Sequence, residues 1–210
     1  MKTVLAFGDS NTWGLVPGSK NLERFPFEKR WTGILQSQCP QVHIIEEGLC
    51  GRTTVFEDSF RPGRNGAAAL PMLLESHFPL DGAILMLGTN DCKMIYGNSA
   101  YSIGKGIEIC LDELERFLAP QQILLVSPIW LNEDVWQEDK DPEFGTASVE
   151  ISRQLKAVYQ RIAAERGTNF FAASDYARAS STDAEHMNAE GHRLFASALY
   201  QKFKEMKIAE

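Results

Sequence analysis

Val4-Leu5-Ala6-Phe7-Gly8-Asp9-Ser10-Asn11-Thr12 is a short apolar run that ends in a small polar turn. The run over residues 4–7 stops at a glycine, which is typical of a buried strand. In open α/β sheets, ligands bind and chemistry occurs just past the carboxyl ends of the strands. Ser10 falls at that place, so we interpret it as a candidate nucleophile. The alternative is a plain Gly-Asp-Ser turn, unless the chain also supplies a base, an orienting acid and oxyanion donors.

Apolar runs alternate with helical patterns along the rest of the chain. Further strands are predicted over residues 42–45, 83–87, 123–126 and 170–172. Helices are predicted over residues 28–38, 65–76, 102–118, 148–166 and 190–206. Strands separated by such helices indicate βαβ units and a parallel sheet with helices on both faces. The predicted fold is α/β: a flavodoxin-like three-layer α/β/α sandwich on a five-stranded parallel sheet, forming one domain over residues 1–210.

The composition narrows the classes of protein to consider. The chain has 210 residues, 44% hydrophobic and 23% charged, which is enough for a packed core. Its net charge of −7 argues against a nucleic-acid partner, which would require a basic face. No apolar segment approaches the roughly 20 residues that span a bilayer, and the N-terminal apolar run is too short for a secretory signal. The four cysteines show no C-x-x-C spacing, so we expect free thiols and a cytoplasmic protein without a membrane partner.

A loop before the last predicted helix offers a general base. It contains Asp183-Ala184-Glu185-His186. In a turn, this spacing lets the carboxylate accept from Nδ1 and hold Nε2 toward a hydroxyl, as in a hydrolytic triad. A helix-capping loop is the alternative, with Asp183 or Asn188 as the cap. The other three histidines lie within a strand or helices, where structural or surface roles are expected.

Acyl transfer also requires donors at the place where the carbonyl oxygen becomes negative. The backbone N–H of Ser10, the backbone N–H of Gly51 and the carboxamide of Asn90 follow three different predicted strands. Parallel strands bring these exits to one edge of the sheet. Taken singly, Gly51 and Asn90 can be explained as turn-forming residues.

The conjunction of these four blocks resembles the SGNH (GDSL-like) hydrolase family. The hallmark residues fall on Ser10, Gly51, Asn90 and His186, with Asp183 as the triad acid, and the resemblance covers almost the whole chain. Residues 7–14, 30–33, 46–54, 65–67 and 86–91 resemble the arylesterase and acyltransferase branch more narrowly. Three departures, at Asn11, at Glu46-Glu47 and at Ala184-Glu185, bear on substrate preference more than on the reaction.

The resemblance implies a serine esterase that hydrolyses short-chain acyl esters without a cofactor. It also implies acyl transfer to alcohols or peroxide as a side reaction, and a homo-oligomer. Carbohydrate O-acetyl esterase activity shares this chemistry and stays open as the alternative, as does a non-catalytic acyl-binding relative. The only expected partner besides further copies of the chain is a small-molecule ester.

Three details remain open at this point. Asp9, Asp91 and His186 could form a metal site, although a simpler role for both aspartates is to accept backbone N–H bonds, and we expect no metal. Residues 132–145 form an acidic insertion, a candidate lid or oligomer contact. Apolar residues near the strand exits could line an acyl pocket or serve as core or oligomer contacts: Trp13, Phe56, Met94, Ile95, Tyr96, Ile129 and Trp130.

Overall fold

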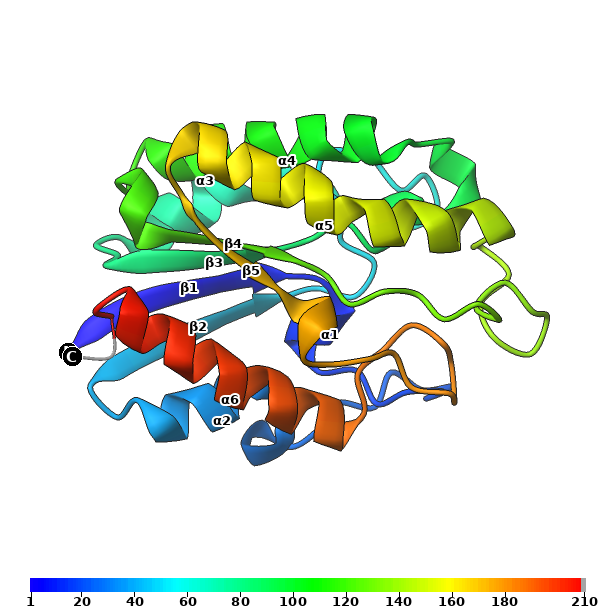
Figure 1. Cartoon of the computed structure of the whole chain (residues 1–210), viewed down its shortest axis with the longest axis horizontal. Helices are drawn as coiled ribbons and strands as arrows, with labels where there is room; N and C mark the ends of the chain where they lie inside the picture. The colour runs from blue at the N-terminus through cyan, green and yellow to red at the C-terminus, as the bar shows by residue number, and fades with distance from the viewer. Residues whose placement is uncertain (209–210) are drawn as a thin grey trace.

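An all-parallel five-stranded sheet lies at the centre of the computed structural model, which describes residues 1–208. The strands are β1 (Lys2–Gly8), β2 (Val42–Gly48), β3 (Gly82–Met86), β4 (Ile123–Ser127) and β5 (Asn169–Ala172). Their order across the sheet is β2-β1-β3-β4-β5, so β1 is interior (Figure 1). This confirms the predicted α/β fold.

Helices cover both faces of the sheet. They are α1 (Ser10–Trp13), α2 (Trp31–Gln38), α3 (Gly66–His77), α4 (Ala100–Glu115), α5 (Thr146–Arg166) and α6 (Ala189–Glu205). Helices α3, α4 and α5 lie on one side, and α2 and α6 lie on the other (Figure 1). Side chains along β1 alternate between the two faces of the sheet. Leu5 and Phe7 join the core beneath α3, α4 and α5, while Val4 and Ala6 join the core beneath α2 and α6. The chain therefore has two hydrophobic cores separated by the sheet.

Several boundaries differ from the sequence prediction for local reasons. Strand β2 continues through Glu46 and Glu47 to Gly48, because its parallel pairing with β1 extends that far. Helix α2 begins only at Trp31, because Arg30 is extended after a 3-10 turn over Phe27–Lys29. Helix α4 begins at Ala100, where Ser99 caps the first turn. The polar turn after β1 is itself one turn of helix, α1.

The structure shows the state of the four cysteines and the character of the helices. All four cysteines are free thiols; Cys50 alone is partly exposed. None of the helices found in residues 1–208 combines the length and the apolar character that crossing a membrane requires.

Tyr159 of α5 links a helix to the end of an interior strand. Its side chain is fully buried, and its hydroxyl donates a hydrogen bond to the backbone oxygen of Leu87 at 2.9 Å. Leu87 directly follows β3 and precedes Gly88, whose φ of +122° only glycine adopts readily. A side chain at Gly88 would also meet the Tyr159 hydroxyl at 2.3 Å. Tyr159 therefore fixes the start of the loop that carries Asn90.

We predict that Tyr159→Phe lowers the free energy of unfolding by about 1 kcal/mol, because it removes a buried donor and leaves a carbonyl unpaired. Urea denaturation monitored by tryptophan fluorescence measures the change. Tyr176→Phe is the matched control, because Tyr176 is 48% exposed and should change stability by less than about 0.5 kcal/mol. Equal stability of wild type and Tyr159→Phe would contradict this role.

Candidate active site

The loops that leave the carboxyl ends of β1, β2 and β3 meet at one edge of the sheet, where the loop before α6 joins them. Figure 1 shows α1, the loop before α6 and the segment 132–145 on the same side of the molecule. Ser10 is the first residue of α1, and the side chain of Asp9 caps this turn by accepting from the Asn11 N–H at 3.0 Å. Ser10 is only 3% exposed, so most of the residue is packed against other protein groups.

Ser10, His186 and Asp183 form one continuous hydrogen-bonded line. The Ser10 Oγ lies 2.8 Å from Nε2 of His186, although the two residues are 176 positions apart in the chain. The Nδ1 of His186 lies 2.8 Å from Oδ2 of Asp183. This arrangement of hydroxyl, imidazole and carboxylate can activate the hydroxyl as a nucleophile. The structure thus brings together the three residues expected to form the triad.

The turn between Asp183 and His186 has a special backbone conformation. Ala184 is fully buried with a φ of +67°, a left-handed conformation that is uncommon outside glycine. This turn lets one oxygen of Asp183 accept from the backbone N–H groups of Glu185 (3.2 Å) and His186 (3.0 Å). The other oxygen also accepts from the Gly18 N–H at 3.0 Å. The aspartate is held by its neighbours before any substrate arrives.

Asn11 ties the two ends of the chain together beside the triad, a role that the sequence analysis missed. Its side-chain oxygen accepts from the backbone N–H of Met187 at 2.9 Å. Ser10 and His186 are the neighbours of these two residues in the chain. The Asn11 contact therefore helps to fix the position of Ser10 relative to His186. In the sequence, the only sign of this role is the asparagine that directly follows Ser10.

The three expected oxyanion donors also converge on this place. Gly51 has a φ of +84°, and a side chain there would meet the guanidinium of Arg61 at 2.8 Å. Within residues 1–208, no backbone group accepts from the N–H of Ser10 or Gly51. The carboxamide of Asn90 uses one N–H to bond the Arg52 oxygen at 3.1 Å, which leaves its second N–H available. Ser10, Gly51 and Asn90 all line one cavity of about 150 Å³.

Asp91 links the Gly51 loop to the Asn90 loop. It accepts from the backbone N–H of Thr54 at 2.9 Å and from the Thr54 hydroxyl at 2.5 Å. Burial raises the pKa of Asp91 to about 6, although the Thr54 bonds oppose this shift. Asp9 and Asp91 both accept backbone N–H bonds, the structural role left open for them. In the part of the chain that the structure describes, no three potential metal ligands cluster.

The charge around His186 favours its protonated form. Burial lowers the pKa of His186, but the negative charges of Glu185 and Asp183 outweigh burial and raise it to about 9. The Oε1 of Glu185 lies 3.7 Å from Nε2 of His186. Burial raises the pKa of Asp183, but the hydrogen bonds and charge of His186 have the larger combined effect, so the pKa of Asp183 is lowered. An imidazolium formed during a reaction is therefore well stabilised here.

Two cavities flank His186. The cavity of about 150 Å³ contains Ser10 and the oxyanion candidates, and a second of about 330 Å³ lies on the Asp183 side. They share four lining residues: Leu15, Asp141, Glu185 and His186. Asp141 and Glu143 belong to the segment 132–145. A hydrogen bond from the backbone N–H of Asn132 to the backbone oxygen of Ala184, at 2.9 Å, holds this segment to the loop that carries Asp183 and His186. The segment thus forms one wall of the site.

The apolar residues near the strand exits lie outside the two cavities at His186. Ile129 is buried in the core beneath α2 and α6, while Met94 and Ile95 are 59% and 58% exposed. Trp13 packs against the guanidinium of Arg24 and Trp130 against that of Arg178. None of the seven, Phe56 and Tyr96 included, lines either cavity at His186. Proximity to a strand exit fixed their backbone position but not the direction of their side chains.

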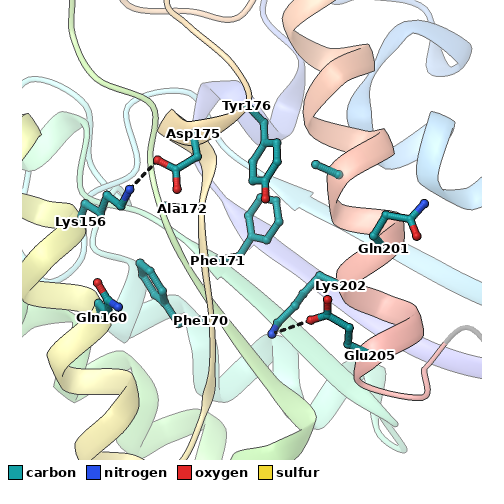
Figure 2. Close-up of a pocket in the computed structure, with 11 residues that line it drawn as sticks. Lys156, Gln160, Phe170, Phe171, Ala172, Asp175, Tyr176, Gln201, Lys202 and Glu205 are labelled. Atoms are coloured by element: carbon teal, nitrogen blue, oxygen red, sulfur yellow. Dashed lines mark hydrogen bonds and ion pairs between the residues drawn. The ribbon is translucent and has the colours of Figure 1, made fainter.

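A further cavity, of about 410 Å³, lies along the edge strand β5 (Figure 2). Phe171 stacks on Tyr176 there, and Lys156 pairs with Asp175 at 2.5 Å. The 11 residues that line it include no serine, cysteine or histidine. The cavity therefore holds no arrangement of serine or cysteine with histidine like that at Ser10.

The comparisons with known proteins agree with this geometry. The sequence matches the GDSL-like lipase/acylhydrolase family over residues 6–194. No curated protein matches the chain. Among solved structures, Est24, a carbohydrate acetylesterase from Sinorhizobium meliloti, is 34% identical with a TM-score of 0.87 and covers 98% of this chain and 100% of its own. The aryl esterase of M. smegmatis is 30% identical, also with a TM-score of 0.87, and covers the same shares.

A more distant structure supports the fold alone. A member of the lipolytic G-D-S-L family from Veillonella parvula is 16% identical, with a TM-score of 0.72, and covers 97% of this chain and 99% of its own. The family match and the esterase neighbours together describe an enzyme that acts on carboxylic esters. The chain therefore belongs to the GDSL-like lipase/acylhydrolase family and has the SGNH hydrolase fold.

Proposed function

We propose that the protein is a serine esterase that hydrolyses short-chain acyl esters through an acyl-enzyme on Ser10. One observation carries this proposal: Ser10, His186 and Asp183 are joined by two hydrogen bonds of 2.8 Å each. The hydroxyl opens into a cavity that also holds the N–H of Gly51 and the carboxamide of Asn90. Nucleophile, base, orienting acid and oxyanion donors are thus all present in one place.

In the first half of the reaction, the Ser10 oxygen attacks the ester carbonyl while His186 takes the serine proton. The carbonyl oxygen becomes negative and receives hydrogen bonds from the N–H groups of Ser10, Gly51 and Asn90. When the tetrahedral intermediate collapses, the bond to the alcohol oxygen breaks and His186 returns the proton to that oxygen. Asp183 holds the imidazole tautomer and stabilises the imidazolium. The products are the free alcohol and an ester on Ser10.

In the second half, water attacks the acyl-enzyme and His186 again acts as the base. The new carbon–oxygen bond forms, the bond to Ser10 breaks, and the serine oxygen recovers its proton from His186. An alcohol or hydrogen peroxide can replace water at this step without any change in proton transfers. We therefore include acyl transfer to such acceptors as a side reaction of the same site.

The size and polarity of the cavities favour a small acyl group and a polar alcohol. The cavity at Ser10 has a volume of about 150 Å³, and its only aliphatic side chains are those of Leu15 and Leu22. The larger cavity on the Asp183 side is lined mainly by charged side chains and hydroxyls. This observation favours the second candidate, a carbohydrate O-acetyl esterase, which uses the same residues on a sugar ester. The non-catalytic alternative would leave the triad geometry without a role.

We predict that Ser10→Ala lowers kcat/KM for p-nitrophenyl acetate by about 10⁴- to 10⁶-fold, because the nucleophile is lost. The measurement is release of p-nitrophenol from acetyl to octanoyl esters by the purified proteins, with rates falling as the chain lengthens. Ser181→Ala is the matched control, since Ser181 is an exposed serine that lines neither cavity at His186. Undiminished turnover in Ser10→Ala would refute the mechanism.

The charges around His186 lead to a prediction about pH. Only neutral imidazole can accept the serine proton, so kcat/KM must rise as the pH increases through the His186 pKa. The nearby carboxylates raise this pKa from 6.5 to about 9. We therefore expect the midpoint of the acid limb to lie above 6.5, toward 9, in a pH profile of kcat/KM corrected with Ser10→Ala at each pH. A midpoint at or below 6.5 would show that Glu185 and Asp183 do not act on His186 in this way.

A further inference from the structure

Glu185 is a buried carboxylate that the triad does not use. It is 5% exposed, and within residues 1–208 its carboxylate accepts no hydrogen bond. Its one charged contact is the His186 ring at 3.7 Å, beyond hydrogen-bond length. Glu185 lines both cavities at His186, and neither of its carboxylate oxygens is fully enclosed by protein atoms. A side chain in this state is ready to accept a donor from a bound molecule.

The cations near Glu185 are engaged with other groups. The ammonium of Lys93 pairs with Glu143 and lies 3.9 Å from Asp141. The ammonium of Lys140 donates to the backbone oxygens of Ser181 and Thr182 at 2.8 and 3.1 Å. Neither lysine donates to Glu185. Water or a bound molecule in the cavities can therefore donate to the Glu185 carboxylate.

Glu185 lies on the boundary between the two cavities at His186. In the proposed reaction, the ester carbonyl occupies the smaller cavity with Ser10, Gly51 and Asn90. The alcohol then extends into the larger cavity, which contains none of those donors. Nε2 of His186 must reach the ester oxygen to protonate it, and Glu185 lies 3.7 Å from that nitrogen. Glu185 therefore faces the atoms of the alcohol that lie next to the ester oxygen.

The lining of the larger cavity indicates the chemistry of that alcohol. The cavity presents two lysines, four carboxylates and two hydroxyls: Lys20, Lys140, Asp139, Asp141, Asp183, Glu185, Ser19 and Thr182. A surface that offers both donors and acceptors suits a neutral group with several hydroxyls. Because carboxylates outnumber lysines in this lining, an ammonium group is the competing donor to Glu185, and a comparison of a charged with a neutral ester separates the two.

We propose that Glu185 selects esters of polyols by accepting a hydrogen bond from the hydroxyl adjacent to the ester oxygen. The inference rests on the proposed esterase function and adds the class of alcohol. A neighbouring hydroxyl can donate to Glu185 while the ester oxygen receives its proton from His186. An alcohol without that hydroxyl leaves the carboxylate buried and unpaired in the transition state. Glu185 is then a specificity-determining residue.

The test compares small acetate esters of matched shape. 2-Hydroxyethyl acetate carries the adjacent hydroxyl, propyl acetate replaces it with a methyl group, and 2-methoxyethyl acetate keeps the oxygen but cannot donate. Acetate release by the full-length protein gives kcat/KM for each. We expect 2-hydroxyethyl acetate to exceed both others by about 10- to 100-fold, the range for a hydrogen bond to a charged group. Equal kcat/KM for the three esters would overturn the proposal.

Variants at the same position assign the preference to Glu185. Glu185→Met keeps the length of the side chain without an acceptor, and should reduce the preference to less than about 3-fold. Glu185→Gln keeps one neutral acceptor and should retain an intermediate preference. Glu138→Gln is the matched control, because Glu138 is an exposed residue of the segment 132–145 that lines neither cavity, and it should keep the full preference. A full preference in Glu185→Met would overturn the proposal even if the wild type discriminates.

Two further arms separate the possible failures. p-Nitrophenyl acetate reports the esterase function alone: turnover of this ester without discrimination among the three acetates contradicts the role of Glu185 but leaves the triad intact. No turnover of any ester overturns both. Acetylcholine and its neutral analogue 3,3-dimethylbutyl acetate test recognition of charge. A 10-fold preference for acetylcholine that disappears in Glu185→Met would show that Glu185 binds a cation, and would contradict selection of a hydroxyl.

Discussion

The parallel pairing of β1 with both β2 and β3 is the constraint on which the rest of the structure depends. In the register of these strands, Gly8 lies beside Gly48 on one side and beside Met86 on the other. The chain leaves all three positions in the same direction, so Ser10 and the loops to Gly51 and Asn90 begin side by side. The absence of a side chain at Gly48 allows α1 to approach, since a Cβ there would meet the Trp13 nitrogen at 2.2 Å. The positions of the candidate nucleophile and of its candidate oxyanion donors therefore follow from strand register.

The base reaches the nucleophile by a different route. The loop that carries His186 follows β5, which lies at the far edge of the sheet from β2 and does not pair with β1. Two hydrogen bonds hold this loop in place: the side-chain oxygen of Asn11 accepts from the Met187 N–H, and the backbone N–H of Asn132 donates to the backbone oxygen of Ala184. The segment 132–145 thus both supports the triad and adds acidic groups to its wall. Beside the triad, the burial of Asp9 itself raises the pKa of its carboxyl to about 7.

The fold could be predicted from the sequence because it rests on short-range signals, whereas the triad candidates emerged only from the combination of four distant blocks and its resemblance to a family. Apolar runs between helical patterns define a parallel sheet, and the loops after its strands must share an edge. The lining of the cavities could not be predicted in this way. Ile129 and Glu185 both lie near the edge, yet the first points into a core and the second into the site. The direction of a side chain depends on tertiary packing, and a glutamate between two triad residues has no period or spacing that would reveal its role.

The central claim is that Ser10 is the nucleophile of this site. Diethyl p-nitrophenyl phosphate phosphorylates activated serines and leaves a stable adduct, which mass spectrometry of the intact protein and of its peptides locates. The account predicts one diethylphosphate per chain, on Ser10, with ester hydrolysis lost in proportion to the labelled fraction. Loss of hydrolysis with the adduct on another residue, or full labelling of Ser10 with hydrolysis retained, would contradict it.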